Sequence, residues 1–177
     1  TDPAGERHDA IWYRMGDKTY PLSHNRIRHI YEDKEQQLWI ATDGSINRYD
    51  YATRQFIHYN IVDNTGTYNT NWTYYIFEDT AGQLWISTCL GGIFVVDKRK
   101  LMQSTSGQYI AEQNYSVHNG LSGMFINQII PDNEGNVWVL LYNNKGIDKI
   151  NPRTREVTKL FADELTGEKS PNYLLCD

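Results

Sequence analysis

Apolar and aromatic residues occur in this chain in short runs, and each run is bounded by Gly, Asp, Asn or Thr. Examples are residues 38–42, 84–88 and 137–141, which are rich in Trp, Ile, Leu and Val. Short runs of β-branched and aromatic residues predict strands, and the bounding residues predict tight turns. No segment of useful length has apolar residues at the spacing of a helix face. The pattern therefore predicts an all-β fold.

A tandem repeat organises these runs. Each unit carries one tryptophan, at Trp39, Trp85 and Trp138, and these residues are 46 and 53 positions apart. The aligned segments are residues 30–42, 76–88 and 129–141. A repeat of this length is typical of β-propellers, in which a four-stranded sheet, or blade, cannot bury both faces alone. We predict that the tryptophans pack between neighbouring blades.

Each unit also carries a turn signal before its tryptophan strand. In the second unit Asp79 is followed by Gly82. The Asp side chain accepts hydrogen bonds from the backbone ahead of it, and the Gly adopts a positive φ. In the first unit Gln36 stands at the glycine position. Because a positive φ costs a residue with a side chain about 1 kcal/mol, we expect that turn to adopt another form.

The predicted fold class is an all-β β-propeller segment of about three full four-stranded antiparallel blades, with partial blades at both ends. The predicted segments are an outer hairpin of a preceding blade at 10–22, blades at 23–59, 69–112 and 122–160, and the first strand of a following blade at 170–177.

The length of the chain leaves its closure open. At about 46 residues per blade, the chain supplies nearly four blades, and most propellers have more. The chain is therefore a piece of a longer propeller, half of a ring completed by a second copy, or a small four-bladed ring. The first alternative is favoured. The apolar faces of an open arc would then predict self-association.

The charge and composition of the chain argue against several classes of partner. The formal net charge is −5 and the pI is about 5.5. The basic run at residues 98–100 is short, so we interpret it as a solvated turn and expect no nucleic-acid binding. No apolar stretch approaches the roughly 18 residues that cross a bilayer, so we expect no membrane insertion by this segment. Cys89 and Cys176 are too few for a disulfide framework and match no zinc module.

Catalytic motifs are missing from the sequence. The histidines are scattered without metal-ligand spacing, at His8, His24, His29, His58 and His118. Residues 132–136 look like the start of a calcium loop but lack its twelfth-position acid. There is no glycine-rich phosphate loop and no nucleophile elbow. We therefore expect no metal, no cofactor and no enzymatic activity in this chain.

The repeated pattern is Ile-x-Glu-Asp-x-x-Gly-x-Leu-Trp-Ile-x-Thr, followed by Gly, a short strand and an Asp turn. It resembles the two-component regulator propeller repeat over about residues 23–160. Residues 76–88 are the best copy. The third copy departs at Pro131 and Leu141, and the first lacks the turn glycine.

The resemblance implies a periplasmic location, in the sensor region of a hybrid two-component system of Bacteroides-like bacteria. It implies that the partners are the rest of the receptor chain, which would carry a membrane span and a histidine kinase, and an oligosaccharide ligand. A likeness of fold alone does not identify the ligand.

Candidate site residues follow from the same alignment, because propellers bind ligands at one end of the central channel. When the units are aligned on their turn aspartates, two aligned positions stand out, each with one residue from every unit. The second position is two residues after the first, so the side chains at both positions point to the same side of a strand. The candidate ligand-binding residues are Arg26, Trp72 and Phe125, then Arg28, Tyr74 and Asn127. Aromatic faces stack on sugar rings, and amides and charged groups bind hydroxyls. The alternative is that these side chains only line or fill the channel.

Three functions stay open. The leading hypothesis is a ligand-sensing propeller of a signalling receptor. The second is a scaffold for protein interaction or dimerisation without a small ligand. The third is a lyase-like propeller enzyme, against which the scattered histidines argue. Residues 67–75, which are polar and aromatic together, are either a sugar-binding loop or a long connection between blades.

Overall fold

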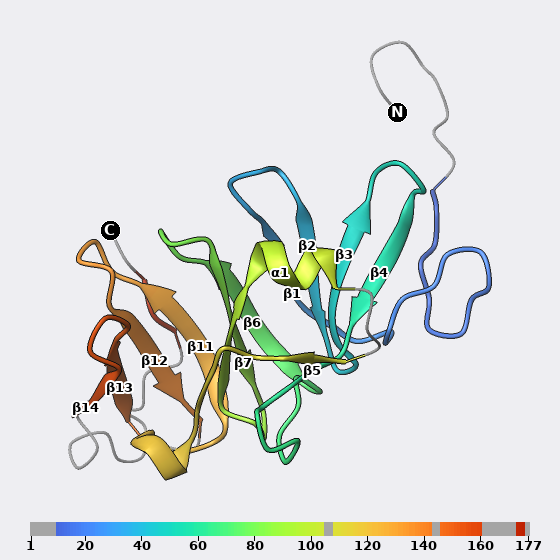
Figure 1. Ribbon diagram of the computed structural model, residues 1–177. Coiled ribbons are helices and arrows are strands. Elements are labelled where there is room, and N and C mark those ends of the chain that lie inside the picture. The colour runs from blue at the N-terminus through green and yellow to red at the C-terminus, as the bar shows by residue number, and fades with distance from the viewer. Residues whose placement is uncertain (1–9, 105–107, 143–145, 161–172, 176–177) are drawn as a thin grey trace.

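The computed structural model describes residues 10–104, 108–142, 146–160 and 173–175. Three four-stranded antiparallel sheets follow one another along the chain (Figure 1). Blade 1 contains β1 (Ile27–Glu32), β2 (Leu38–Thr42), β3 (Ser45–Asp50) and β4 (Gln55–Tyr59). Blade 2 contains β6 (Thr73–Glu78), β7 (Gln83–Thr88), β8 (Ile93–Asp97) and β10 (Gln113–Tyr115). Blade 3 contains β11 (Ile126–Pro131), β12 (Val137–Leu141), β13 (Ile147–Asn151) and β14 (Glu156–Leu160).

The first strand of each blade lies on the inner side of an arc. Within each sheet the strands pair in chain order, and β6 packs against β1 on one side and against β11 on the other. Sheets that stack radially about their first strands are the blades of a β-propeller. The predicted fold class is therefore confirmed.

Two apolar cores hold the arc together, and both lie between blades. The first joins blades 1 and 2 and contains Trp39 and Phe94. The second joins blades 2 and 3 and contains Trp85 and Val139. Trp39 and Trp85 are fully buried in these cores, as predicted, whereas Trp138 on the far side of blade 3 is only partly buried. Blade 2 thus contributes residues from both of its faces, which a single sheet cannot bury alone.

An aspartate clamps the first turn of every blade. In blade 1, Asp33 Oδ1 accepts hydrogen bonds from the backbone N–H groups of Glu35 (2.9 Å) and Gln37 (2.8 Å). Its Oδ2 accepts one from the Trp39 indole Nε1–H at 2.9 Å. The same indole bond of 2.9 Å recurs in the pairs Trp85–Asp79 and Trp138–Asp132. The aspartate therefore links the turn to the buried ring, which explains why the two residue types recur together.

The turn of blade 1 keeps this form despite its Gln36, so the expectation of a different turn was wrong. Gln36 has φ 61°, where the equivalent Gly82 has φ 78°. The Gln36 N–H donates to the Asp33 carbonyl at 2.9 Å, as the Gly82 N–H does to Asp79 at 3.3 Å. The hydrogen bonds made by Asp33 offset the cost of a left-handed Gln, which is about 1 kcal/mol.

A short helix, α1 (Lys98–Gln103), follows β8 and was not predicted. The Asp97 side chain caps it by accepting from the Lys100 N–H at 3.0 Å. A short strand, β9 (Tyr109–Ile110), completes the insertion of blade 2 and pairs in parallel with β5 (Ile61–Val62). The 3-10 helix η1 (Val117–Asn119) lies between blades 2 and 3.

Lys98 corrects the interpretation of residues 98–100 as a solvated turn, because only Arg99 and Lys100 are exposed. The Lys98 side chain is 2% exposed, and its Nζ lies 3.0 Å from Asp33 Oδ2 and 2.8 Å from Glu78 Oε1. Burial alone would lower the pKa of Lys98, but the bonds to Glu78 and Asp33 raise it overall. The basic residue thus joins blade 2 to the turn of blade 1.

Described residues near both ends of the chain contact the blades. Around Arg14 and Pro21 there is a single parallel bridge in place of the expected antiparallel hairpin, so assigning residues 10–22 to a preceding blade stays a prediction. At the other end, the Leu174 N–H donates to Gln128 Oε1 at 2.7 Å, just as the Ile76 N–H donates to His29 Nδ1 at 3.3 Å. Residues 173–175 therefore lie beside β11 as β6 lies beside β1. The rest of 170–177, with Cys176, and His8 fall outside the described residues.

Candidate functional site

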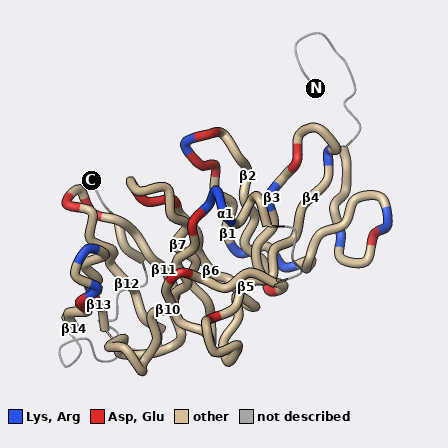
Figure 2. The backbone as a smooth tube through the Cα atoms, viewed as in Figure 1, with Lys and Arg blue, Asp and Glu red and all other residues tan. Residues whose placement is uncertain are grey.

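The two ends of the blades differ in chemistry. The end called here the turn end carries the aspartate-clamped turns, at the top of Figure 1, and the backbone in Figure 2 is coloured for acidic residues at each of them. These turns are residues 33–37, 79–83 and 132–136. The opposite end, where the chain passes from one blade to the next, exposes large aromatic and apolar side chains. They include Trp72, Leu90, Phe125 and Tyr142, which are 43% to 54% exposed.

A β-bulge marks the same position in every blade at this opposite end. The ladder between the first and second strands shifts register between Ile27 and His29, between Thr73 and Tyr75, and between Ile126 and Gln128. The skipped residues are Arg28, Tyr74 and Asn127. A bulge bends its strand and re-aims a side chain, and bulges are common beside binding sites. Three blades thus present three different side chains from one backbone position.

A second repeated contact fixes the residues around each bulge. The backbone N–H that follows the second strand donates to the carbonyl that precedes the first strand. The pairs are Asp43 to Arg26 (3.3 Å), Cys89 to Trp72 (3.0 Å) and Tyr142 to Phe125 (2.9 Å). We call these six residues and the three bulge residues the rim. Its backbone repeats from blade to blade while its side chains do not.

The charged part of the rim belongs to blade 1. Asp43 accepts from Arg28 Nε at 2.7 Å and from Arg28 Nη2 at 3.4 Å, and Arg26 Nη1 lies 3.3 Å from the same carboxylate. The hydrogen bond to Asp43 raises the pKa of Arg28 further. The Arg28 guanidinium also lies over the Tyr74 ring of blade 2, with 4.5 Å between its carbon and the ring centroid. The arrangement ties the bulges of two blades together.

Tyr74 separates two hollows. The axial hollow, of about 400 Å³, is lined by Arg28, His29, Tyr74, Tyr75, Asn127, Gln128 and Tyr173. Its neighbour, of about 210 Å³, is lined by Tyr74, Cys89, Phe125, Ile126 and Tyr142. Burial raises the pKa of the Tyr74 phenol and that of the Cys89 thiol, so both groups are neutral at pH 7. The hollows are therefore aromatic, with hydroxyl, thiol, amide, imidazole and guanidinium groups beside the rings.

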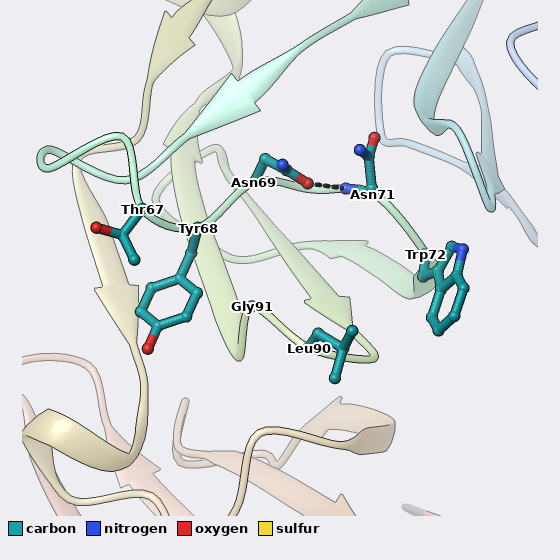
Figure 3. A pocket seen from close by; sticks show the side chains of 7 residues that line it. All are labelled: Thr67, Tyr68, Asn69, Asn71, Trp72, Leu90 and Gly91. Atoms are coloured by element: carbon teal, nitrogen blue, oxygen red, sulfur yellow. Dashed lines mark hydrogen bonds between the residues drawn. The ribbon is translucent and has the colours of Figure 1, made fainter.

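Trp72 lines a third hollow, of about 330 Å³, shown in Figure 3. Its φ is 54°, a conformation that costs a residue with a side chain about 1 kcal/mol. The Trp72 N–H donates to the Asp43 carbonyl at 3.0 Å, which helps to hold this conformation. In Figure 3 the side chains of Tyr68, Leu90 and Trp72 point to the same side of the loop, whereas Asn69 and Asn71 lie together on the other. The backbone thus holds the indole ring out toward solvent.

The structure places the predicted site residues at the same end of the blades. Arg28, Tyr74 and Asn127 line the axial hollow, Phe125 lines the hollow that shares Tyr74 with it, and Trp72 lines the third. Arg26 reaches the group through Asp43. The expected reason for their convergence, two-residue alternation along a strand, was wrong, because each bulge breaks the alternation at the second position.

Sequence reasoning missed three members of the rim: Asp43, Cys89 and Tyr142. They follow the tryptophan strands and keep the spacing of the repeat, so the same alignment contained the signal. The three residues differ in chemistry, so the aligned position does not stand out as a site. His29 and Tyr75 were also missed; their rings stack with centroids 3.8 Å apart, and burial lowers the pKa of His29.

Side chains that could ligate a metal ion do not gather in the described part of the chain. There, no three His, Cys, Asp or Glu side chains come together as a metal site would require. No described helix has the length and apolar character needed to span a bilayer.

The fold and rim define the class of protein: a segment of a β-propeller with a varied surface at one end. The family model of the two component regulator propeller matches residues 21–44 and 120–143. Two solved structures of the extracellular domain of BT4673 from Bacteroides thetaiotaomicron, described as a one-component and as a hybrid two-component system, are 99% identical to the chain with a TM-score of 0.94. The chain thus carries the two component regulator propeller repeat at two places, and is nearly identical to part of these extracellular domains.

The matched domains are much longer than this chain. They cover all of it, whereas it spans 24% of their length. Because both are extracellular domains, the predicted extracytoplasmic location is confirmed for this segment.

More distant structures share the fold alone. The extracellular domain of BT3049 from the same organism is 23% identical, with a TM-score of 0.57 over 75% of this chain and 17% of its own. Virginiamycin B lyase from Staphylococcus aureus is 15% identical, with a TM-score of 0.57 over 79% of this chain and 43% of its own. No curated protein sequence matches the chain.

Proposed function

We propose that this segment is part of the ligand-sensing surface of a hybrid two-component receptor, and that an oligosaccharide binds at its rim. Such a receptor would pass the signal to a histidine kinase elsewhere in its chain. The segment itself would bind without catalysing a reaction. The match to extracellular domains of this type supports the receptor context.

One observation carries the choice of site. A backbone position that bulges in the same way in three blades presents three side chains of different chemistry, Arg28, Tyr74 and Asn127. Channel filling would require buried side chains, but Trp72 is 48% and Phe125 43% exposed. Sugars need flat aromatic faces beside groups that bind hydroxyls, and the hollows around Tyr74 offer both.

Calorimetry on the complete extracellular domain with a panel of oligosaccharides tests the proposal. We expect one sugar class to bind, and we expect Tyr74→Ala to weaken that binding at least about tenfold, because the phenol faces two hollows. The matched control is Tyr51→Ala, which removes an exposed tyrosine at the turn end. Equal affinity of both variants, or no binding by any sugar, would count against the proposal.

The face of blade 1 that points away from blade 2 supports a second role, as a surface that another blade covers. Ile30 is 58% exposed, whereas its repeat equivalents Ile76 and Ile129 are fully buried between blades. We propose that another blade covers this face, either from the rest of the receptor or from a second copy. Light scattering separates the two. If the receptor's own chain covers Ile30, then Ile30→Lys leaves the mass of the complete domain unchanged and lowers its stability. If a copy covers it, the substitution converts a dimer to a monomer.

A further inference from the structure

We propose that the oligosaccharide taken at the rim is anionic, and that its carboxylate or sulfate group binds Arg26 and Arg28. This inference rests on the proposed function and adds the chemical class of the ligand. It starts from an excess of positive charge in blade 1.

Two guanidinium groups surround one carboxylate. Arg28 alone gives Asp43 two hydrogen bonds, at 2.7 and 3.4 Å, which is the fork geometry that satisfies a carboxylate. Arg26 adds a second cation at 3.3 Å, and its side chain is 65% exposed. The trio therefore carries one net positive charge. The Asp43 side chain is 7% exposed, whereas most of the N–H donors of Arg26 point to solvent and not to Asp43.

The architecture of the blade does not require this charge. At the same positions, blade 2 holds Trp72, Tyr74 and Cys89, and makes the same backbone bonds. Blade 3 holds Phe125, Asn127 and Tyr142, and does so too. Two arginines and an aspartate are thus an addition made in one blade. Arg28 has a structural contact with Tyr74, whereas Arg26 takes no part in it, so this second cation is best explained by what it binds.

The surroundings leave that cation available to a ligand. No described residue that lines the axial hollow, the hollow that shares Tyr74 with it or the hollow at Trp72 is an Asp or Glu. Asp43 is therefore the one carboxylate among the described rim residues, and Arg28 already occupies it. The chain as a whole has a net charge of −5, so this local positive charge is opposite in sign to that of the chain.

The same geometry suggests how such a sugar would lie. Arg28 extends over the Tyr74 ring at 4.5 Å and carries the positive charge to the edge of the axial hollow. A sugar ring stacked on an aromatic face of the rim would bring an acidic substituent within reach of the guanidinium groups. Arginine binds carboxylate and sulfate in a planar, two-point manner, which a neutral sugar cannot use.

Matched sugars on the complete extracellular domain test the inference. The probes are trigalacturonic acid and its neutral methyl ester, and a sulfated chondroitin disaccharide with its desulfated form. We expect one acidic form to bind about tenfold or more tightly than its neutral partner, since hydrogen bonds to charged groups are the strong ones. The first pair reports a carboxylate site and the second a sulfate site.

Arg26→Gln is the decisive variant, because Arg28 still satisfies Asp43 when Arg26 is changed. We expect it to remove most of the preference for the acidic form and to weaken the salt dependence of binding. Arg99→Gln, an exposed arginine on α1, is the control and should change neither. If acidic and neutral sugars bind equally and Arg26→Gln has no effect, the inference fails while the proposed function stands. If no sugar binds, the proposed function fails first.

Discussion

The turn end and the rim are built from the same repeat, but their side chains repeat at the turn end and vary from blade to blade at the rim. At the turn end all three blades have the same aspartate, in the same bond of 2.9 Å to a tryptophan indole. At the rim the backbone contacts recur equally well, but the bulge position holds Arg28, Tyr74 and Asn127. Repeated geometry with repeated chemistry indicates a structural role. Repeated geometry with varied chemistry indicates a surface free to serve a ligand.

The largest effect is expected from Lys98, which joins two blades near the turn end. Lys98→Met should lower the stability of the complete extracellular domain by about 3–5 kcal/mol, because Asp33 and Glu78 would stay buried without their cation. Denaturant unfolding measures the loss. Arg99→Met, an exposed change in the same helix, is the control. Equal stability of the two variants would show that the buried ion pairs contribute little.

The same cluster predicts a dependence on pH. Burial alone would raise the pKa of Asp33, but hydrogen bonds from Trp39, Gln37 and Lys98 lower it overall. Its stabilising contribution is therefore present above its unfolded pKa of about 3.9 and is lost as the pH falls through the lower folded value. The pKa of Lys98 is raised, so its contribution is present below about 10.4 and is lost as the pH rises through the folded value.

Melting temperatures of the wild type and Lys98→Met across pH check these signs. We expect the difference between the two proteins to be largest between about pH 4 and pH 10, and to shrink on both sides. A difference that stays constant through this range and beyond it would contradict the assignment.

An intermediate effect is expected from the clamp itself. Asp79→Ala removes the bonds to the Ala81 and Gln83 N–H groups and to the Trp85 indole, and should cost about 1–3 kcal/mol. Sugar binding should be unchanged, because the rim lies at the opposite end of the strands. Asp50→Ala, in another turn, should cost less, because Asp50 accepts from the Ala52 N–H and the Thr53 hydroxyl but from no buried indole. A loss of sugar binding by Asp79→Ala would break the separation of the two ends.

A substitution at the rim should have the opposite effect: affinity for the sugar should fall, while the stability of the domain should stay the same. Trp72→Gly removes an indole that is 48% exposed and places at φ 54° a residue that accepts this conformation. We expect affinity for the sugar to fall about tenfold while the melting temperature is unchanged or slightly higher. A large fall in melting temperature would mean that Trp72 belongs to the core.

The smallest effect concerns the one turn that lacks its glycine. Gln36→Gly should raise stability by about 0.5–1 kcal/mol, because φ 61° is unfavourable for Gln and allowed for Gly. The melting temperature of the complete domain measures the gain. An unchanged or lower value would show that the Gln36 side chain makes a compensating contact.

The repeat made the blades predictable, because Trp, Asp and Gly at steady spacing report contacts within one unit. It could not reveal Lys98, whose partner Asp33 lies 65 residues away in the neighbouring blade. The rim was predictable only in part. The alignment singled out Arg28 and Tyr74, but the bulge that aims them depends on strand pairing, and chemical difference concealed their neighbour Asp43.

Hydrogen exchange of the complete extracellular domain, with and without its sugar, tests most directly whether the rim is the binding surface. The account predicts new protection at residues 26–28, 72–74 and 125–127, and unchanged exchange at residues 33–37, 79–83 and 132–136. Protection confined to those turns, or lying wholly outside this chain, would contradict it.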